Sequence, residues 1–170
     1  ITKRINLVEI FKNDTFAFVP YTVEGDDRPE DISHLYYGDM EYTWLVYLAN
    51  GIMDPYNGWP KSMQSFDRYI IKKYADQANT TGDSVLEWAM KTTIDDNIVE
   101  YRHVDDPENT ITVGTWENKD LIVGFNEVEW QPIRVYDYEF ELDNAKRSIF
   151  LVNRFYVDQM KDELRKILNG

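Results

Sequence analysis

A pair of short helices is predicted by RPEDISHLYYGDMEYTWLVYLANGIMDPYNGW, residues 28–59. Pro29 suits the first position of a helix, and the two acids after it favour the positive end of the helix dipole. Gly38 ends this helix because Gly adopts the left-handed conformation at little cost. Apolar residues between 41 and 50 recur at helical spacing, and Gly51 marks the end of the second helix.

Strand and helix signals extend outward on both sides of this pair. Upstream, residues 15–24 read as a strand, and Pro20 inside them favours an edge strand because proline lacks an amide donor. Downstream, residues 54–60 read as a loop dense in turn formers. Ser62 can then cap a longer helix that runs to about residue 77, and another short helix is expected from residue 83 or 84.

The second half of the chain alternates with a period of two, which predicts strands. The clearest strand is 133–142, where aromatic or apolar residues alternate with acids. Its acidic face, which we expect to be solvated or to meet a basic partner, carries Asp137, Glu139, Glu141 and Asp143. Shorter strands are expected at 98–104, 111–116, 121–125 and 149–152. An amphipathic helix from about 155 to 168 closes the chain.

The composition excludes several classes of function. The 170 residues include 18 Lys plus Arg and 31 Asp plus Glu, a formal net charge of −13, which argues against a nucleic-acid-binding surface. No apolar run approaches the roughly 18 residues of a membrane-spanning helix, so membrane insertion is not expected. Without Cys the chain offers neither a disulfide framework nor a thiolate zinc site, and its two His leave little room for a histidine-based metal site. We therefore expect no metal site and no cofactor.

No catalytic site is indicated either. Acidic pairs such as Glu100 with Asp106 could act as an acid and a base, but among 31 acids such pairs arise by chance. His34 and His103 are better explained as surface or packing residues than as bases. The acids near 95–97 lack the ligand spacing of a calcium loop, and the chain has no phosphate-binding glycine loop. We therefore expect that the protein is not an enzyme.

The helical pair carries a frame of residues that resembles a known module. The first helix ends in Tyr37-Gly38, Trp44 lies inside the second, Asn50 ends it, and Asp54-Pro55 follows. This frame is similar to the LysM helical pair as it occurs in phage tail proteins. With Tyr56 and Gly58-Trp59 added, the segment resembles the LysM-like baseplate wedge subunit of contractile-tailed bacteriophages, the gene product fifty-three family.

Two further stretches are similar to that family, residues 7–13 before the first strand and residues 136–168 at the end, whereas residues 80–130 are not matched. The family's first residues have no counterpart, and the chain begins with Ile1 rather than Met, so we expect the natural chain to start earlier. The resemblance implies an α+β fold with a LysM-like β-α-α-β core, a β-rich insertion and a C-terminal amphipathic helix. We expect residues 148–152 to return and pair with the strand at 15–23.

That topology divides the chain into three parts. Residues 1–60 are the N-terminal segment and the LysM-like core. Residues 61–145 form a helical and β-rich insertion, and residues 146–170 supply the closing strand and the C-terminal helix.

The resemblance also implies a function. It points to a non-catalytic structural subunit of a phage tail baseplate wedge, which connects wedge proteins and helps to join adjacent wedges around the tail tube. The expected partners are other wedge subunits, and the expected location is the virion tail baseplate, with the host cytoplasm during assembly. The alternative is a peptidoglycan-binding LysM module of a cell-wall or tail-tip protein, and a wall hydrolase is a weaker third reading. Glycan binding is not favoured, because Asp26, Asp27 and Asp54 would line the groove.

Candidate interface residues come from the same frame: Trp44, Asn50, Asp54, Pro55, Tyr56 and Trp59. Packing is the simplest role for Trp44, and turn or helix-end roles suit Asn50 and Asp54. Large aromatics in or near turns, which include Trp88, Trp116 and Trp130, can instead anchor an interface. We expect a protein with Tyr56→Ala and Trp59→Ala to fold but to fail to enter wedges.

Overall fold

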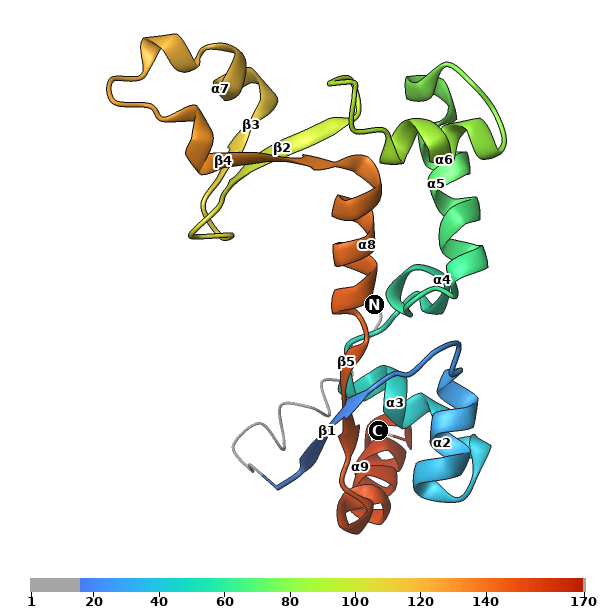
Figure 1. Ribbon diagram of the computed structural model, residues 1–170. Coiled ribbons are helices and arrows are strands. Elements are labelled where there is room, and N and C mark those ends of the chain that lie inside the picture. Colours follow the sequence, from blue (N-terminus) through green and yellow to red (C-terminus); the bar gives the residue numbers. More distant parts are fainter. Residues whose placement is uncertain (1–15, 170) are drawn as a thin grey trace. The chain divides into compact units, whose positions relative to one another are not determined.

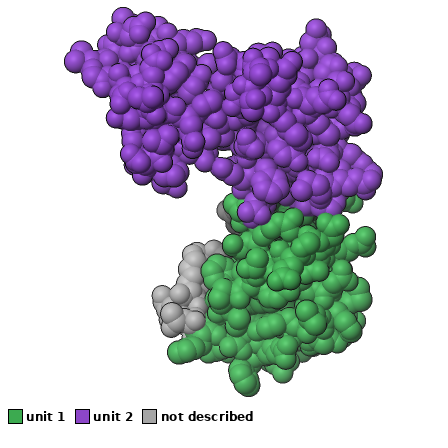
Figure 2. Space-filling model, viewed as in Figure 1, with its two compact units in different colours: residues 1–60, 145–170 green, residues 61–144 purple. Residues whose placement is uncertain are grey.

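The computed structural model describes residues 16–169 and divides into two compact units. Unit 1 combines residues up to Pro60 with residues from Ala145 onward, and unit 2 is the continuous stretch 61–144 (Figure 2). The chain therefore leaves unit 1 once and returns to it once. The segment 7–13, which resembles the family's start, lies outside the described residues.

The two-stranded sheet of unit 1 joins segments far apart in sequence. Strand β1 (Phe18–Thr22) pairs antiparallel with β5 (Ser148–Val152), side by side in Figure 1. The predicted return of residues 148–152 to the first strand is confirmed. Pro20 lies opposite Phe150, while the inter-strand hydrogen bonds flank that pair at Val23 and Ala17. The missing N–H of Pro20 therefore faces the outer edge of β1, where it removes no bond from the ladder.

The predicted helical pair of unit 1 is confirmed. Gly38 follows the first helix with a φ of 85°, and its N–H donates to the His34 carbonyl, 2.9 Å away. The predicted loop at 54–60 contains one helical turn. The helices of unit 1 are α2 (Pro29–Tyr37), η1 (Met40–Tyr42), α3 (Thr43–Ala49), α4 (Pro55–Gly58), η4 (Arg154–Tyr156) and α9 (Val157–Asn169).

The core of unit 1 packs the helices against the inner face of the sheet. Its two clusters of buried side chains contain Ala17, Leu45, Val152, Val157 and Met160, and Val23, Ile32, Val46, Ile149 and Leu151. Both clusters draw residues from β5, so the strand that returns from unit 2 completes the core of unit 1.

Unit 2 consists of helices and a three-stranded antiparallel sheet of order β3-β2-β4. Ser62 caps the long helix by accepting from the Ser65 N–H, 3.3 Å away, as predicted. A buried cluster of Phe66, Ile70, Ala89 and Val135 lies between its helices. The elements are α5 (Met63–Ala78), α6 (Asp83–Met90), β2 (Ile98–His103), β3 (Thr110–Thr112), α7 (Val113–Glu117), η2 (Lys119–Leu121), η3 (Glu127–Glu129), β4 (Trp130–Arg134) and α8 (Val135–Ala145).

The prediction of a strand over 133–142 is wrong. Strand β4 ends at Arg134, and residues 135–145 form helix α8. Its buried residues, Val135, Glu139 and Asp143, recur every four positions, which is helical spacing. The alternation misleads because two of its acids are buried, while Asp137 and Glu141 are exposed. The predicted acidic face therefore does not exist as one surface.

Two shorter strand predictions are also wrong for most of their length. After the three-residue strand β3, Thr112 caps helix α7 by accepting from the Thr115 N–H, 3.2 Å away. Residues 121–125 form no strand, because the chain turns through Gly124 with a φ of 80°. The insertion is consequently more helical than the expected β-rich one, and the molecule is a mixed α+β protein. No helix within 16–169 is long and apolar enough to span a membrane.

Candidate interaction surface

Asn50 holds the helical pair to the sheet of unit 1. Its Nδ2 donates to the carbonyls of Phe150 and Val46, each 2.8 Å away, and its Oδ1 accepts from the Phe150 N–H at 2.8 Å. The side-chain amide therefore pairs with the edge of β5 as one residue of a further strand would. This places Asn50 in an internal structural contact.

The two tryptophans of the candidate set also make internal contacts. Trp44 is half-buried and packs against the cluster around Leu45 and Met160. Trp59 packs against the second cluster of unit 1, and its Nε1–H donates to the carbonyl of Asp27, 3.0 Å away. Trp59 thus ties the end of α4 to the turn after β1, and truncating it would cost stability as well as surface.

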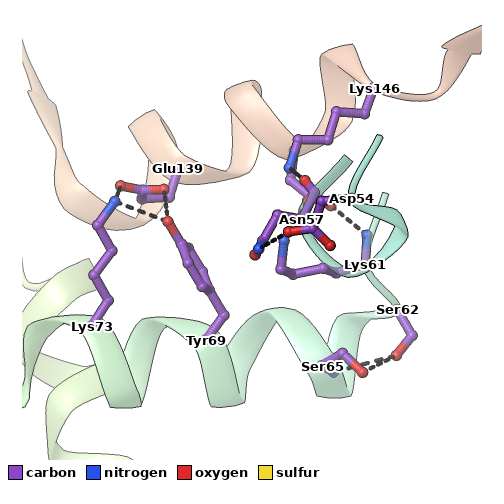
Figure 3. Close-up of polar contacts among 10 residues, drawn as sticks. Asp54, Asn57, Lys61, Ser62, Ser65, Tyr69, Lys73, Glu139 and Lys146 are labelled. Carbon is purple, nitrogen blue, oxygen red and sulfur yellow. Dashed lines mark hydrogen bonds and ion pairs between the residues drawn. The ribbon is translucent and has the colours of Figure 1, made fainter. Parts of the chain in front are cut away.

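The remaining three candidates form the outward face of α4. Asp54 caps this turn, because its carboxylate accepts from the Tyr56 N–H at 3.0 Å. It also accepts from Nδ2 of Asn57 at 2.6 Å (Figure 3). The hydrogen bond from Asn57 lowers the pKa of Asp54. Pro55 occupies the first helical position, and Lys146 donates to the Asn57 carbonyl at 2.8 Å. The turn is thereby fixed with Tyr56 outward.

The exposure of this turn identifies a residue that the sequence did not single out. Tyr56 is 90% exposed and Met53, just before the capping aspartate, is 84% exposed. Met53 carries no motif and lies in no periodic pattern, so its exposure follows only from the fold. The pair presents an aromatic and a flexible thioether side chain, the residue types that protein interfaces favour.

In unit 2 the buried Glu139 of α8 is bound to α5. Glu139 accepts from Lys73 Nζ at 2.7 Å and from the Tyr69 hydroxyl at 2.9 Å (Figure 3). It also accepts from the Tyr74 hydroxyl at 2.5 Å. Burial alone raises the pKa of Glu139, but these hydrogen bonds outweigh it and the pKa is lowered. Burial and the bond to Glu139 raise the pKa of Tyr74 to about 12. The Glu139 carboxylate therefore has a structural role, since it joins α8 to α5.

Asp143 joins the first and last segments of unit 2. It accepts from the backbone N–H of Lys61 at 2.8 Å and lies 3.4 Å from Lys61 Nζ. Both side chains are largely buried. The second buried acid thus also has a structural role, and it holds the two ends of the insertion together.

The described residues show no arrangement suited to metal chemistry. Among residues 16–169, no group of three or more His, Cys, Asp or Glu side chains could hold a metal ion. His103 instead lies 3.6 Å from Glu129 and packs edge-on against Trp130, and Glu100 pairs with Arg102 at 2.9 Å. The candidate site is therefore the exposed surface around Met53 and Tyr56.

Residues 3–167 match the family model described as Base plate wedge protein 53. The chain belongs to this family. A curated relative, baseplate wedge protein gp53 of Enterobacteria phage T4, is 32% identical to it over 66 residues. That stretch covers 39% of this chain and 32% of the relative, so less than half of either protein is aligned. The resemblance to the baseplate wedge family that is predicted from residues 28–59 is confirmed.

Proposed function

We propose that this wedge protein is a non-catalytic connector, which binds other wedge subunits and helps to join adjacent wedges around the tail tube. Its site of action would be the tail baseplate of the virion, which it would enter from the host cytoplasm during assembly. The observation that carries the proposal is the family match over residues 3–167, which includes both units. Many preformed contacts, repeated around a symmetric ring, would supply the binding energy.

Unit 1 is proposed as a LysM-like docking module. The order β1, α2, α3, β5, with antiparallel strands, supports this assignment because it is the strand-helix-helix-strand order of that module. The proposed contact surface is the α4 turn with Met53 and Tyr56, held outward by Asp54 and Pro55. Trp44, Asn50 and Trp59 would act indirectly, by keeping the helices and the turn in place.

The same topology is also what a peptidoglycan-binding LysM module would have. Its groove would use residues 25–28 and 51–54, where Asp26, Asp27 and Asp54 lie. Trp59 already donates a hydrogen bond to the Asp27 carbonyl, so its indole is committed to the fold at that turn. These features favour a protein partner over a glycan.

The test is affinity capture of the tagged full chain from a lysate in which the phage assembles, together with sedimentation with insoluble peptidoglycan. We expect stoichiometric wedge subunits in the capture and the protein in the peptidoglycan supernatant. Pelleting with peptidoglycan and no captured subunits would support the glycan-binding alternative. Release of soluble fragments from the peptidoglycan would contradict the non-catalytic assignment.

A double variant tests the α4 turn. Met53→Ser with Tyr56→Ala should lower incorporation into wedges about tenfold or more, since exposed aromatic anchors often carry binding energy. Its thermal stability should stay unchanged, because both side chains are exposed. The matched control is Leu35→Ser with Met40→Ser, also exposed in unit 1. Equal incorporation of both variants would remove this turn from the interface.

A further inference from the structure

A segment of unit 2 exposes aliphatic side chains that folded proteins normally bury. Residues 104–129, here called the arm, run from the end of β2 through β3 and α7 to the start of β4. The part from α7 onward forms the lobe labelled α7 in Figure 1. Single exposed aliphatic residues are ordinary, but a group of them within eight positions marks an interaction surface. The exposed fractions are 81% for Leu121, 43% for Ile122, 102% for Val123 and 84% for Val128.

The backbone of the arm directs these side chains outward. Gly124 adopts a φ of 80°, which reverses the chain directly after Val123. The Phe125 N–H then donates to the Ile122 carbonyl at 3.3 Å, and Phe125 points back toward the aromatic residues of the sheet. The turn thus separates Leu121 to Val123 from Phe125, which packs inside. These three residues, with the exposed Val128, are here called the tip.

A set of stacked rings fixes the base of the arm. Trp116 stacks on Tyr101 with ring centroids 4.0 Å apart, and Phe125 meets Trp116 edge-on at 5.8 Å. Phe125 also stacks on Trp130 at 5.8 Å. Trp116 and Trp130, for which the sequence allows either a core or an interface role, are therefore engaged inside unit 2. A preformed base lowers the ordering cost of binding at the tip.

The arm is strongly acidic, and four of its acids, Glu117, Asp120, Glu127 and Glu129, lie in the same stretch as the exposed aliphatic residues. It contains seven Asp or Glu residues and a single Lys, a formal charge of −6 out of −13 for the whole chain. That Lys119 is already engaged, 3.8 Å from Glu127 and 4.6 Å from the Trp116 ring centroid. Such a surface repels a second arm, a nucleic acid and an anionic membrane, and it attracts a basic protein surface.

We propose that the arm inserts its tip into another subunit of the baseplate wedge, at an apolar pocket bordered by Lys and Arg side chains. The aliphatic tip would supply affinity through burial, and the acidic rim would supply orientation and rapid association. This inference rests on the proposed function, because it names the chemistry of one partner of the same connector.

The experiment uses the full chain and, as the probe, purified wedge complexes assembled by co-expressing the other wedge subunits without it. The variant Leu121→Ser, Val123→Ser, Val128→Ser should weaken binding by about 100-fold, because hot-spot residues at the centre of an interface dominate affinity. The control Leu35→Ser, Met90→Ser, Leu142→Ser removes three exposed apolar residues elsewhere, which are less exposed than those of the arm, and should bind as wild type does. Circular dichroism and melting temperature should not change in either.

The outcomes distinguish a failure of the arm inference from a failure of the proposed connector function. If the wild-type chain does not bind the probe complex, the connector function fails. If wild type and the arm variant bind equally, or if the control loses as much affinity as the arm variant, only the arm inference is overturned.

The identity of the occupant is tested by a photo-reactive amino acid at position 123. We expect cross-links to a peptide of another wedge subunit that contains Lys or Arg, and an association rate that falls with added salt. The variant Glu117→Gln, Asp120→Asn should associate about tenfold more slowly at low salt and depend less on salt. Cross-links between two copies of this chain, or salt-independent association, would overturn the proposed chemistry.

Discussion

In each unit one polar side chain holds a helix in place, but this side chain is neutral in unit 1 and charged in unit 2. In unit 1 a neutral amide, Asn50, joins the end of α3 to the backbone of Phe150 on β5. In unit 2 a charged carboxylate, Glu139 of α8, binds the side chains of α5. A neutral amide keeps its hydrogen bonds at any ordinary pH, whereas a carboxylate loses its ion pair when protonated. The comparison predicts that the units respond differently to mutation and to acid.

The largest expected effect is at Glu139. Glu139→Ala should lower the free energy of unfolding by about 3 kcal/mol, because it removes a buried carboxylate that accepts hydrogen bonds from Lys73 and from two tyrosine hydroxyls. Urea unfolding of the full chain measures it. Asp137→Asn, an exposed acid on the same helix, is the control and should change stability by less than about 0.5 kcal/mol. Equal effects at the two positions would show that Glu139 does not hold α8.

A smaller effect is expected at Asn50. Asn50→Ala leaves the N–H and carbonyl of Phe150 without their protein partner, but water can reach this edge, so we expect a loss of about 1 kcal/mol. The same unfolding experiment applies, with Gln159→Ala, exposed on α9, as the control. A loss larger than that of Glu139→Ala would reverse the ranking of the two contacts.

Acidification should destabilise unit 2 before it destabilises unit 1. The pKa of Glu139 is lowered in the folded protein, so its stabilising contribution is complete above the pKa of 4.5 for a free glutamate and is lost as the pH falls through the folded value. Hydrogen exchange followed by mass spectrometry should show amides of α5 and α8 losing protection on acidification before those of α3 and β5. The lowered pKa of Asp54 in unit 1 affects only the exposed turn α4. Simultaneous loss in both units would contradict the prediction.

The smallest effect on stability is expected at Tyr56. Because Tyr56 is 90% exposed, Tyr56→Ala should change the free energy of unfolding by less than about 0.5 kcal/mol. Trp59→Ala is the comparison and should destabilise the protein clearly, since it removes packing and the bond to Asp27. Two equal values would mean that the α4 turn does not depend on Trp59.

Much of unit 1 can be predicted from the sequence because its signals are local. Pro29 and Gly38 bound the first helix, and Pro20 marks a strand edge, each through its own backbone geometry. In unit 2 the alternating pattern gives a wrong prediction because it does not show which acids are buried. Alternation of aromatic and acidic residues predicts a strand at 133–142 only if every acid is solvated, and Glu139 and Asp143 are not. Their partners, Lys73 and Lys61, lie far away in the sequence.

The candidate site divides in the same way. The frame Trp44, Asn50, Asp54, Pro55, Tyr56 and Trp59 can be found from the sequence, and with it the family. The sequence does not reveal which of these side chains point outward. The exposure of Trp59 and Asn50 depends on their partners Asp27 and Phe150, which approach them only in the folded chain. The aliphatic tip of the arm is hidden for the same reason, since Leu121 to Val123 read equally well as a buried strand.

The sequence alone determined the helix ends, the edge strand and the membership of the wedge family. Helix ends and edge strands depend on backbone preferences within a few residues, and the family depends on the order of motif residues along the chain. The tertiary structure decided which charges are buried and which apolar groups are exposed. Both depend on partners brought together by chain segments that are distant in sequence, and the free energy of burying a charge or exposing a methyl group is set by those partners.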